Sequence, residues 1–422
     1  MLTLQLFREN KALILNGLKK KNFKEPEIVD LIIEKDEGKR AMQQESEALA
    51  SEIKQISKEV GGLMAKGEKE KAEAVKNEVG ALKEEQKQIA ADVARLEQEV
   101  LALLLKLPNL PHESVPEGFG ADDNEVVYCV ENIPEMAEEA LPHWELAKKY
   151  NLIDFETGVK ITGSGFPLYV NKGARLQRAL ISYFLDFNTQ AGYQEYEPPF
   201  MVNEDSAYGT GQLPDKEGQM YHATADNFYL IPTAEVPLTN IYRDVIIDKA
   251  QLPVKMTAYT PCFRREAGSY GKDVRGLNRL HQFDKVELVN ICRSEVSYQV
   301  LDEMVAHVEN LLKSLQLPYR VLRLCGGDMS FTSALTYDFE VYSAAQKRWL
   351  EVSSVSNFES YQSNRMKIRY KGENGKTELL HTLNGSSLAL PRILACLLEN
   401  NQQADGIHLP EVLWPYIGKV IN

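Results

Sequence analysis

A cluster of basic residues lies within the segment TPCFRREAGSYGKDVRGLNRLHQFDKVE, residues 260–287, although the chain as a whole has a formal net charge of -13. Arginine side chains form paired hydrogen bonds with phosphate oxygens, so such a cluster suits a ligand that carries phosphate groups. A ladder of surface ion pairs would use the same charges, and the residues alone do not choose between the two. The basic residues are Arg264, Arg265, Lys272, Arg275, Arg279 and Lys285.

Two strands are predicted to position this cluster. Residues 254–266 and 279–291 alternate apolar and polar residues, and a glycine-rich loop joins them into a long hairpin. Alternate side chains of a strand share one face, and here that face would contain a guanidinium group, carboxylates and an aromatic ring. The ring can stack on a base and the carboxylates can accept hydrogen bonds from amino groups, so the face suits a nucleotide. Its residues are Arg264 and Glu266 on the first strand and Phe283, Lys285 and Glu287 on the second.

Composition places the chain among ordinary globular proteins. Its 422 residues, 44% of them hydrophobic, can bury a large core in two or three domains. No run of about 18 apolar residues could span a bilayer, and the N-terminal residues lack the pattern of a signal peptide, so we expect a cytoplasmic protein. The acidic balance means that any nucleic acid must be bound by local basic patches. The five cysteines form no C-x-x-C pair and favour neither disulfides nor a zinc site.

A long helical segment is predicted between residues 27 and 105, which contain no aromatic residue and are rich in Ala, Glu, Lys and Leu. Apolar or small residues recur at alternating steps of three and four, the spacing of a coiled-coil seam. Gly61, Gly62 and Gly67 lie between two halves of similar length and predict a helix break with a reversal of the chain. We therefore expect an antiparallel hairpin of two helices, each of roughly 35 residues and about 50 Å long.

The outer faces of this arm permit more than one role. A coiled coil between two chains or a rigid spacer is the common use of such heptads, but two matching halves around a glycine turn favour a hairpin that pairs with itself. Lysines near the tip could contact nucleic acid, yet they alternate with glutamates, which is at least as typical of a solvated face. These lysines are Lys54, Lys58, Lys66, Lys69, Lys71, Lys76, Lys83 and Lys87.

The remainder of the chain predicts a second domain of mixed structure. Residues 107–125 are rich in proline and glycine and are expected to form a linker. Beyond them, helical and alternating stretches are interspersed, which favours an α+β fold with a largely antiparallel sheet flanked by helices. We therefore expect residues 1–106 to form an N-terminal domain that contains the arm, and residues 126–422 to form the main domain.

Four motifs give a resemblance to a known family. The segment PCFRREAGSYGKDVRGLNRLHQFDKVE, together with LIPTAEVPLTN, YGTGQLP and HTLNGSSLALPRILACLLEN, resembles the class II aminoacyl-tRNA synthetases and, among them, the bacterial-type seryl-tRNA synthetases. The resemblance covers essentially the whole chain, and its motifs are long and specific. It implies a ligase that activates serine with ATP and transfers it to the 3'-terminal adenosine of tRNA(Ser), and also of tRNA(Sec). It further implies that residues 1–106 bind tRNA, that residues 126–422 are catalytic, and that the protein is a homodimer.

The resemblance assigns roles to individual residues. Arg264 would contact the α-phosphate of ATP, with Arg265 beside it, and Arg392 would reach the γ-phosphate; Arg264 and Arg392 are the expected catalytic residues. Glu266 would lie on the adenine side of ATP, and Phe283 would stack on the base. The remaining expected ATP-binding residues are Glu351, Val352, Ser353 and Ser354, of which the first and last would also hold a magnesium ion. The expected serine-binding residues are Thr233, Ala234, Glu235, Glu287 and Ser386.

Two further roles follow from the resemblance, each beside a plainer interpretation. Pro199, in the segment GYQEYEPPFMV, would lie at the dimer interface, although a proline that ends an edge strand needs no partner. Lys272, Arg275 and Arg279 would meet the acceptor end of tRNA, although an exposed solubilising loop has the same composition.

Some features depart from the family pattern. Ser387 and Pro391 stand in a motif that usually has glycines around its strand-to-helix junction, and Pro391 suits a first helical turn. Glu351 and Ser354 are three residues apart, so they could share a metal ion only at a bulge or a strand end. No histidine spacing suggests the structural zinc of some archaeal members. Two alternatives stay open: a relative that activates an amino acid without charging tRNA, and a coiled-coil adaptor with an inactive globular domain.

Overall fold

The structure is a computed structural model that describes the whole chain except residues 132, 134–139 and 267–274. The chain divides into two compact units, Met1–Pro108 and Asn109–Asn422. In the described part of the chain, no helix is long and apolar enough to cross a membrane.

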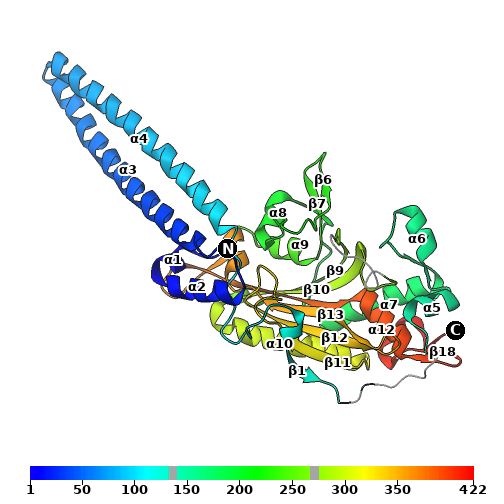
Figure 1. Ribbon diagram of the computed structural model, residues 1–422. Helices are drawn as coiled ribbons and strands as arrows, with labels where there is room; N and C mark the ends of the chain where they lie inside the picture. Colours follow the sequence, from blue (N-terminus) through cyan, green and yellow to red (C-terminus); the bar gives the residue numbers. More distant parts are fainter. Residues whose placement is uncertain (132, 134–139, 267–274) are drawn as a thin grey trace. The chain divides into compact units, whose positions relative to one another are not determined.

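The first unit is built on two long helices, α3 (Ile28–Ala65) and α4 (Lys69–Leu104), which lie side by side in opposite directions (Figure 1). They consist mainly of residues with high helix propensity, and their apolar side chains at steps of three and four form the seam between them. The predicted antiparallel hairpin is therefore confirmed, with helices of 38 and 36 residues. Two shorter helices precede it, α1 (Leu4–Glu9) and α2 (Lys11–Lys20).

The reversal between α3 and α4 lies within the predicted glycine-containing segment, at its last glycine, Gly67. The prediction that Gly61 and Gly62 break the helix is wrong, because α3 continues through both and ends at Ala65. The turn contains Gly67, whose φ of 81° is accessible to glycine at little cost. A glycine within a helix costs about 1 kcal/mol relative to alanine, and packing of the long seam against α4 offsets that cost.

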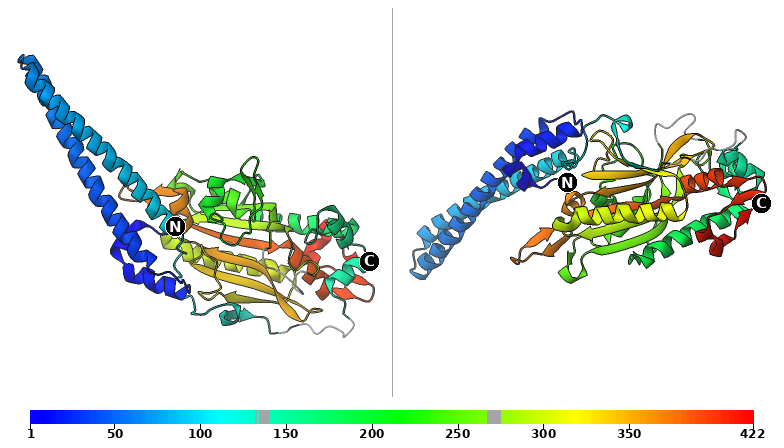
Figure 2. Two further views of the ribbon diagram at one scale, coloured as in Figure 1. Left: turned by 45° about the horizontal axis from the view of Figure 1, so that its top comes forward. Right: turned by 90° about the horizontal axis from the view of Figure 1, so that it is seen from below.

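Two contacts define the register of the hairpin. Lys35 Nζ lies 2.5 Å from Glu99 Oε2, and a Cβ added to Gly38 would be 4.0 Å from the Leu96 side chain. In each pair the two residues are equally far along the chain from Gly67. Residues equidistant from Gly67 therefore face each other. Figure 2 shows the two helices side by side from two further directions.

The second unit is built on an eight-stranded sheet (Figure 1). In order across the sheet, the strands are β1 (Glu125–Cys129), β11 (Tyr319–Arg323), β12 (Leu335–Ser343), β13 (Arg348–Asn357), β16 (His381–Ala389), β10 (Gln282–Cys292), β9 (Val254–Phe263) and β4 (Gln194–Glu195). All neighbouring strands are antiparallel except β9 and β4. The predicted class of fold, a largely antiparallel sheet flanked by helices, is confirmed.

Helices cover the sheet on both faces. Three long helices pack against one face: α7 (Asn171–Gln190), α10 (Ser297–Ser314) and α12 (Leu390–Asn400). The opposite face packs against α9 (Glu235–Asn240) in a second apolar cluster. Leu288 of β10 belongs to the first cluster and Val289 to the second, as alternation requires. Glu287 lies on the same face of β10 as Val289, and it therefore points toward α9.

Shorter elements complete the second unit. The other helices are α5 (His143–Lys149), α6 (Phe155–Ile161), α8 (Glu204–Thr210), α11 (Tyr361–Met366) and α13 (Trp414–Ile417). Single-turn 3-10 helices are η1 (Ala121–Asp123), η2 (Lys249–Gln251), η4 (Ser294–Val296) and η5 (Glu411–Leu413). The strands outside the large sheet are β2 (Ile153–Asp154), β3 (Leu168–Tyr169), β5 (Met201–Asn203), β6 (His222–Ala223), β7 (Phe228–Leu230), β8 (Ile246–Ile247), β14 (Arg369–Lys371), β15 (Thr377–Leu379), β17 (Gln402–Gln403), β18 (Gly406–His408) and β19 (Val420–Ile421).

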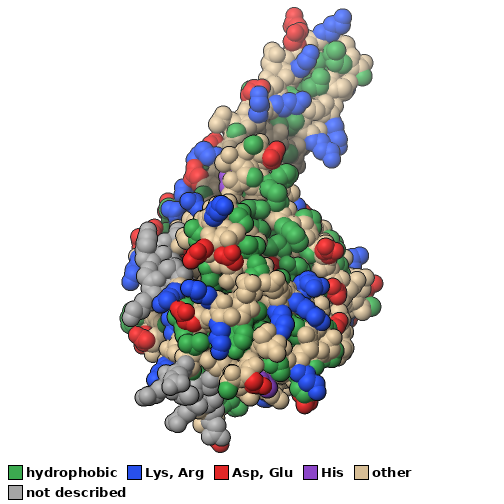
Figure 3. Space-filling view, turned by 90° about the vertical axis from the view of Figure 1, so that its right-hand side faces the viewer, with side chains coloured by type: hydrophobic (Ala, Val, Ile, Leu, Met, Phe, Trp, Pro, Cys, Tyr) green, Lys and Arg blue, Asp and Glu red, His purple; other side chains and the backbone are tan. Residues whose placement is uncertain are grey.

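The surface carries charges of both signs. In the view of Figure 3, lysine and arginine side chains are interspersed with aspartates and glutamates. On this face the net charge of -13 is therefore not concentrated in one acidic field. A polyanionic ligand would meet basic side chains there in small groups, which makes the placement of individual arginines important.

Candidate active site

Arg264 lies directly after β9, beside the ring predicted to stack on a base. Its guanidinium carbon is 5.1 Å from the centroid of the Phe283 ring, and its Nε donates to the Pro232 carbonyl at 3.4 Å. The Arg264 amide donates to the His281 carbonyl at 2.9 Å, which continues the pairing of the two chain segments beyond the end of β9. The structure thus places a guanidinium group and a half-buried aromatic ring side by side.

The prediction that the first strand continues to Glu266 is wrong. β9 ends at Phe263, and Glu266 has a φ of 49°, a left-handed conformation that does not occur in regular strands. The second strand, β10, likewise begins at Gln282, later than predicted. The alternation argument therefore does not apply to Glu266. Its carboxylate instead forms an ion pair with Arg279 at 3.3 Å.

Two buried carboxylates converge on the face of the sheet that packs against α9. Glu287 is fully buried and Glu235 is 6% exposed. The Thr233 hydroxyl donates to Glu287 Oε2 at 2.9 Å and accepts from Lys285 Nζ at 2.9 Å. Asn384 Nδ2 lies 2.9 Å from Glu235 Oε2 and 3.4 Å from Glu287 Oε1, so it joins the two carboxylates. The result is a small, densely hydrogen-bonded cluster of buried polar groups, the candidate serine pocket.

The two carboxylates of this pocket differ in their electrostatic environment. Glu287 forms a buried ion pair with Lys285, which compensates its charge. Glu235 accepts from Gln362 Nε2 at 2.6 Å, without a cation in contact among the described residues. Burial raises the pKa of Glu235 to about 7; the hydrogen bond from Gln362 opposes this shift and the nearby charge of Glu287 adds to it. Glu235 can therefore gain or lose a proton near neutral pH.

The remaining residues expected to bind serine lie around this pocket. Ser386 is opposite Glu287 in the pairing of β16 with β10, and its carbonyl accepts from the Ser353 hydroxyl at 2.6 Å. The side chain of Ala234 belongs to the apolar cluster under α9. The structure thus brings the predicted carboxylates and hydroxyls together, while the Ala234 methyl group serves the core. Ser353 likewise supports the pocket through its side chain.

A bulge in β13 places the two predicted magnesium ligands on one face. Glu351 and Ser354 would point to opposite faces of a regular strand. The register of β13 with β12 shifts between them, so that Glu351 lies opposite Glu340 and Ser354 opposite Asp338. Residues two apart on β12 share a face, and their partners on β13 therefore also share one. Val352, within the bulge, is buried in the core, so that only its backbone could contact ATP.

Asp338 of β12 adds a carboxylate beside Glu351 and Ser354. This residue was not identified from the sequence. Its Oδ1 is buried and has no hydrogen-bond partner among the described residues. Burial and the charge of Glu351 raise the pKa of this carboxyl group well above its ordinary range, although a hydrogen bond with Ser354 opposes the shift. A carboxylate with an unused acceptor is satisfied by a bound cation, and Mg²⁺ prefers oxygen ligands. These three side chains therefore fit a magnesium ion.

Arg392 is held by two backbone carbonyls. Its Nε donates to the Asn278 carbonyl at 3.0 Å, and its Nη1 donates to the Glu351 carbonyl at 2.7 Å. The helix that carries it, α12, begins at Leu390 with Pro391 in its first turn, as predicted. Proline is tolerated there because a first-turn N–H has no partner within the helix. The guanidinium group also lies beside the one carboxylate of β13, with its Nη1 3.7 Å from Glu351 Oε2.

Ser387, the other departure from the family pattern, takes part in a chain of buried hydrogen bonds. Its hydroxyl donates to Asn188 Oδ1 at 2.9 Å, and Asn188 Nδ2 donates to the Thr257 hydroxyl at 2.9 Å. Thr257 in turn donates to the Glu287 carbonyl at 2.8 Å. The next residue, Leu388, has a φ of 70°, a region that usually favours glycine. The hydrogen bonds of Ser387 therefore anchor a strained backbone beside the pocket.

The other predicted basic residues lie nearer the surface. Arg265 is exposed, and Arg275 lies 4.6 Å from the centroid of the Trp144 ring and 3.7 Å from a Glu145 oxygen. Lys272 lies outside the described residues. Arg275 is therefore paired with an aromatic ring and a carboxylate of α5.

Four residues of the site were not assigned a role from the sequence. Asn384 lies within the quoted motif HTLNGSS and Lys285 lies on the predicted strand face, so local signals for both were present. Asp338 and Gln362 reach the site from β12 and α11, and no local pattern marks either of them. Only the folded chain shows that they are buried next to catalytic candidates.

Comparison with known proteins identifies the family. Residues 1–111 match the model of the seryl-tRNA synthetase N-terminal domain, and residues 220–401 match that of the tRNA synthetase class II core domain (G, H, P, S and T). A serine--tRNA ligase from Salinibacter ruber is 53% identical over 420 residues, which are 99% of this chain and 98% of the relative. Another, from Methylacidiphilum infernorum, is 48% identical over 419 residues, 99% of each chain.

A solved structure gives the same result. The crystal structure of seryl-tRNA synthetase from Pyrococcus horikoshii complexed with ATP has a TM-score of 0.94 and 31% sequence identity, and the match covers 100% of this chain and 99% of that one. Both the sequence over its full length and the fold agree with the motifs described above. The chain therefore belongs to the seryl-tRNA synthetase (serine--tRNA ligase) family of class II aminoacyl-tRNA synthetases.

Proposed function

We propose that this protein activates serine with ATP to form seryl-adenylate and transfers the serine to the 3'-terminal adenosine of tRNA(Ser). The observation that carries the proposal is the pocket in which Glu235 and Glu287 are buried around the Thr233 hydroxyl. Its carboxylates can accept hydrogen bonds from the ammonium and hydroxyl groups of serine. Arg264 and Phe283 suit the phosphate and the base of ATP. Membership of the family supports the same reaction.

Activation requires positioned charge and no protein nucleophile. A carboxylate oxygen of serine attacks the α-phosphorus, the bond from this phosphorus to the bridging oxygen breaks, and pyrophosphate leaves. Arg264 stabilises the negative charge that develops on the α-phosphate oxygens, and Arg392 holds the γ-phosphate. Phe283 fixes the base, so the reacting atoms meet in line. Catalysis is thus by proximity and by preorganised electrostatics.

Transfer uses the same pocket together with the first unit. A hydroxyl of the 3'-terminal adenosine attacks the carbonyl carbon of seryl-adenylate, and AMP leaves. Residues 1–106 form the tRNA-binding domain, and residues 126–422 form the catalytic domain, with residues 107–125 between them. The hairpin of α3 and α4 supplies the tRNA contact through its solvent-facing lysines, and tRNA(Sec) is a second substrate. The reaction takes place in the cytoplasm.

A homodimer is part of the proposal. Pro199 is exposed near β4, which forms one edge of the large sheet. The two residues after it, Phe200 and Met201, are large apolar side chains that are 38% and 43% exposed. An apolar patch beside a sheet edge suits a self-complementary interface.

Selectivity for serine follows from the buried carboxylates. Alanine has no hydroxyl group, so it would leave a buried acceptor unpaired, which costs on the order of 1–3 kcal/mol per group. Threonine offers the hydroxyl and must be excluded by lack of room for one methyl group, which is worth only ~1–3 kcal/mol. Threonine is therefore the competitor that the pocket rejects least strongly.

The first test is ATP–pyrophosphate exchange with serine, threonine, alanine and glycine in parallel. We expect exchange with serine, weak exchange with threonine and none above background with alanine or glycine. Charging of tRNA(Ser) with serine is then measured separately. Absence of exchange with all four amino acids would refute the proposed activity.

Serine affinity should depend on pH through Glu235, whose pKa is about 7 in the free protein. Below that pH the carboxyl group is protonated and must lose its proton before it can accept from the serine ammonium group. Binding therefore releases a proton, and the affinity for serine should fall by about tenfold per pH unit below pH 7 and be level just above it. Calorimetry in two buffers of different ionisation enthalpy, at pH 6 and pH 8, measures the released proton. A Glu235→Gln variant should release none, and pH-independent affinity in the unaltered protein would contradict the assignment.

The fit of magnesium to Asp338, Glu351 and Ser354 gives a further prediction. A magnesium ion held there would neutralise charge on the ATP phosphates. Replacing Asp338 with asparagine removes one anionic ligand, so the magnesium concentration for half-maximal exchange should rise by about tenfold. The matched control is Asp244→Asn, an exposed carboxylate that lies 3.8 Å from Lys367 Nζ, which should leave the requirement unchanged. An unchanged requirement in Asp338→Asn would remove this residue from the metal site.

A further inference from the structure

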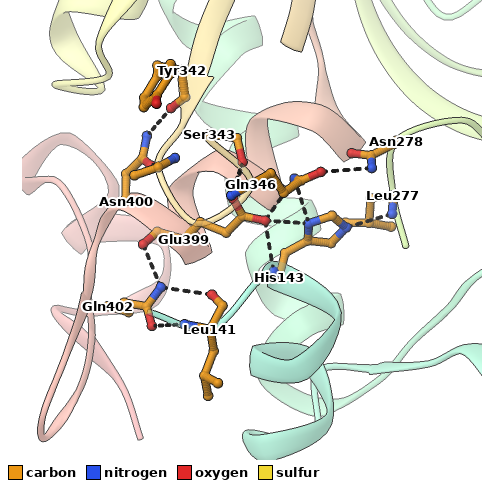
Figure 4. Close-up of polar contacts among 11 residues, drawn as sticks. Leu141, His143, Leu277, Asn278, Tyr342, Ser343, Gln346, Glu399, Asn400 and Gln402 are labelled. Carbon is orange, nitrogen blue, oxygen red and sulfur yellow. Dashed lines mark hydrogen bonds and ion pairs between the residues drawn. The ribbon is translucent and has the colours of Figure 1, made fainter. Parts of the chain in front are cut away.

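A buried polar network around His143 and Glu399 is used by none of the roles above (Figure 4). It is linked to Arg392 through the Asn278 carbonyl. At its centre are His143, the first residue of α5, and Glu399, near the end of α12, both fully buried. Glu399 Oε1 accepts from the His143 amide at 2.9 Å, from His143 Nδ1 at 2.7 Å and from Gln346 Nε2 at 3.0 Å. Its Oε2 accepts from the Ser343 hydroxyl. The network joins two helices to the turn between β12 and β13.

These contacts define where the protons are. The Leu277 amide donates to His143 Nε2 at 2.8 Å, so this nitrogen carries a lone pair and the ring proton is on Nδ1, facing Glu399. Burial raises the pKa of the Glu399 carboxyl group, but the hydrogen bonds from His143 and Ser343 outweigh it and hold the pKa below its ordinary value. His143 thus donates through Nδ1 to the Glu399 carboxylate and accepts from the Leu277 amide at Nε2.

Stability alone is a weak reason for such a pair. An ionised carboxylate is expensive to bury, and well-packed apolar residues in place of a buried polar cluster are often equally stable or more so. Among the described residues, no lysine or arginine forms an ion pair with Glu399. The function of the network is better sought in the backbone segment that it holds.

That segment is the end of the connection between β9 and β10. Gly276 has a φ of 66°, and a Cβ added there would lie 2.2 Å from His143 Nε2, so the imidazole is in close contact with the backbone. Two residues after Gly276, the Asn278 side chain donates through Nδ2 to Gln346 Oε1 at 3.1 Å. The carbonyl of Asn278 accepts from Arg392 Nε at 3.0 Å. The imidazole and the arginine thus bind adjacent residues of one short segment.

We propose that His143 is a positioning residue for ATP, which acts through Arg392. Anchored by Glu399, its Nε2 holds the Leu277 amide, and this fixes the Asn278 carbonyl on which the Arg392 guanidinium rests. The inference depends on the proposed function only in that Arg392 contacts the γ-phosphate. A misplacement of about 1 Å in such a group can cost on the order of 10²-fold in rate.

Two substitutions of His143 separate its two hydrogen bonds. An asparagine amide reaches as far as Nδ1 and can still donate to Glu399, but it offers no acceptor to Leu277. A glutamine carbonyl reaches as far as Nε2 and can still accept from the Leu277 amide. Both variants are uncharged and polar, so a difference between them reports on the link to the backbone segment and not on burial. Gly276→Ala, whose methyl group would displace the imidazole and whose φ of 66° disfavours alanine, disturbs the same segment from the backbone side.

The full-length variants are compared by the kcat/KM of pyrophosphate exchange for ATP, the KM for serine, the Kd for ATP by calorimetry, and the melting temperature. We expect His143→Asn and Gly276→Ala to lower kcat/KM for ATP by about 10- to 100-fold, with the serine KM within about twofold of the unaltered protein. His143→Gln should stay within about threefold for both substrates.

Two results would overturn the role of His143. The first is that kcat/KM and Kd for ATP are unchanged in both His143→Asn and Gly276→Ala. The other is an equal loss in the asparagine and glutamine variants that follows their melting temperatures. If His143→Asn does not fold, Gly276→Ala decides. If the unaltered protein shows no serine-dependent exchange, the proposed function fails by itself, and the Kd for ATP still tests the positioning role.

Discussion

Replacing Arg264 with alanine should reduce serine-dependent ATP–pyrophosphate exchange by about 10³-fold in kcat/KM for ATP. The guanidinium group lies over the Phe283 ring at the end of the hairpin, where the α-phosphate would be bound beside the stacked base. Loss of one preorganised group that stabilises charge in a transition state costs about 10²–10³-fold in kcat, and loss of its contact with bound ATP adds to this. In free energy the expected loss is about 4 kcal/mol.

Two further variants make this result interpretable. Arg264→Lys keeps the positive charge without the planar pair of donors, so it should recover only part of the activity. Arg369→Ala is the control for removal of an arginine from the same unit, because Arg369 lies in β14 and its Nε bonds to the Lys367 carbonyl. The melting temperature should be unchanged in Arg264→Ala, Arg264→Lys and Arg369→Ala, and so should the affinity for serine at pH 8, where Glu235 is ionised. Exchange within about threefold of normal in Arg264→Ala would exclude it as a catalytic residue.

Local spacing predicted the arm, but tertiary packing decided where its helices end. Heptad spacing over residues 27–105 is a property of neighbouring side chains, and it identified both helices of the hairpin. Gly61 and Gly62 were predicted to end the first helix on propensity alone. Propensity differences of about 1 kcal/mol per glycine are small beside the burial of a long seam, so the helix continues to Ala65.

The active site shows the same division between local and long-range information. Alternation placed Lys285 and Glu287 on one face correctly, because β10 pairs with β9 there without a bulge. It failed at Glu266, whose left-handed backbone depends on contacts beyond the strand. Gln362 and Asp338 bring polar groups from distant elements, and such groups have no pattern of their own in the sequence. Side chains that act together across the fold are therefore the part that sequence reasoning misses.

The chain consists of two compact units, and this division suggests that the two steps of the reaction can be separated experimentally. We expect a protein with a shortened arm to retain serine-dependent exchange within about twofold and to lose about 10³-fold in kcat/KM for charging of tRNA(Ser). Facing residues are equidistant from Gly67, so residues 47–87 can be removed and replaced by a four-residue glycine-rich turn without a change of register. The second unit, Asn109–Asn422, forms a compact unit with its own core and contains all the proposed ATP and serine contacts. A loss of about 10³-fold corresponds to about 4 kcal/mol of lost tRNA interaction.

The matched control keeps the length of the arm and changes only its charge. Lys54, Lys58, Lys76 and Lys83 are replaced by glutamine, which should weaken tRNA charging by less than the deletion and reduce its dependence on salt. If the lysine charges near the tip do not matter, the glutamine variant will charge tRNA as well as the unaltered protein, while the protein with the shortened arm will not. The shape of the arm would then explain tRNA binding. Equal loss of exchange and charging in the shortened protein would contradict the separation of roles, because the arm would then be needed for the adenylate step. If the shortened protein keeps both pyrophosphate exchange and tRNA charging, the arm does not bind tRNA and is only a spacer.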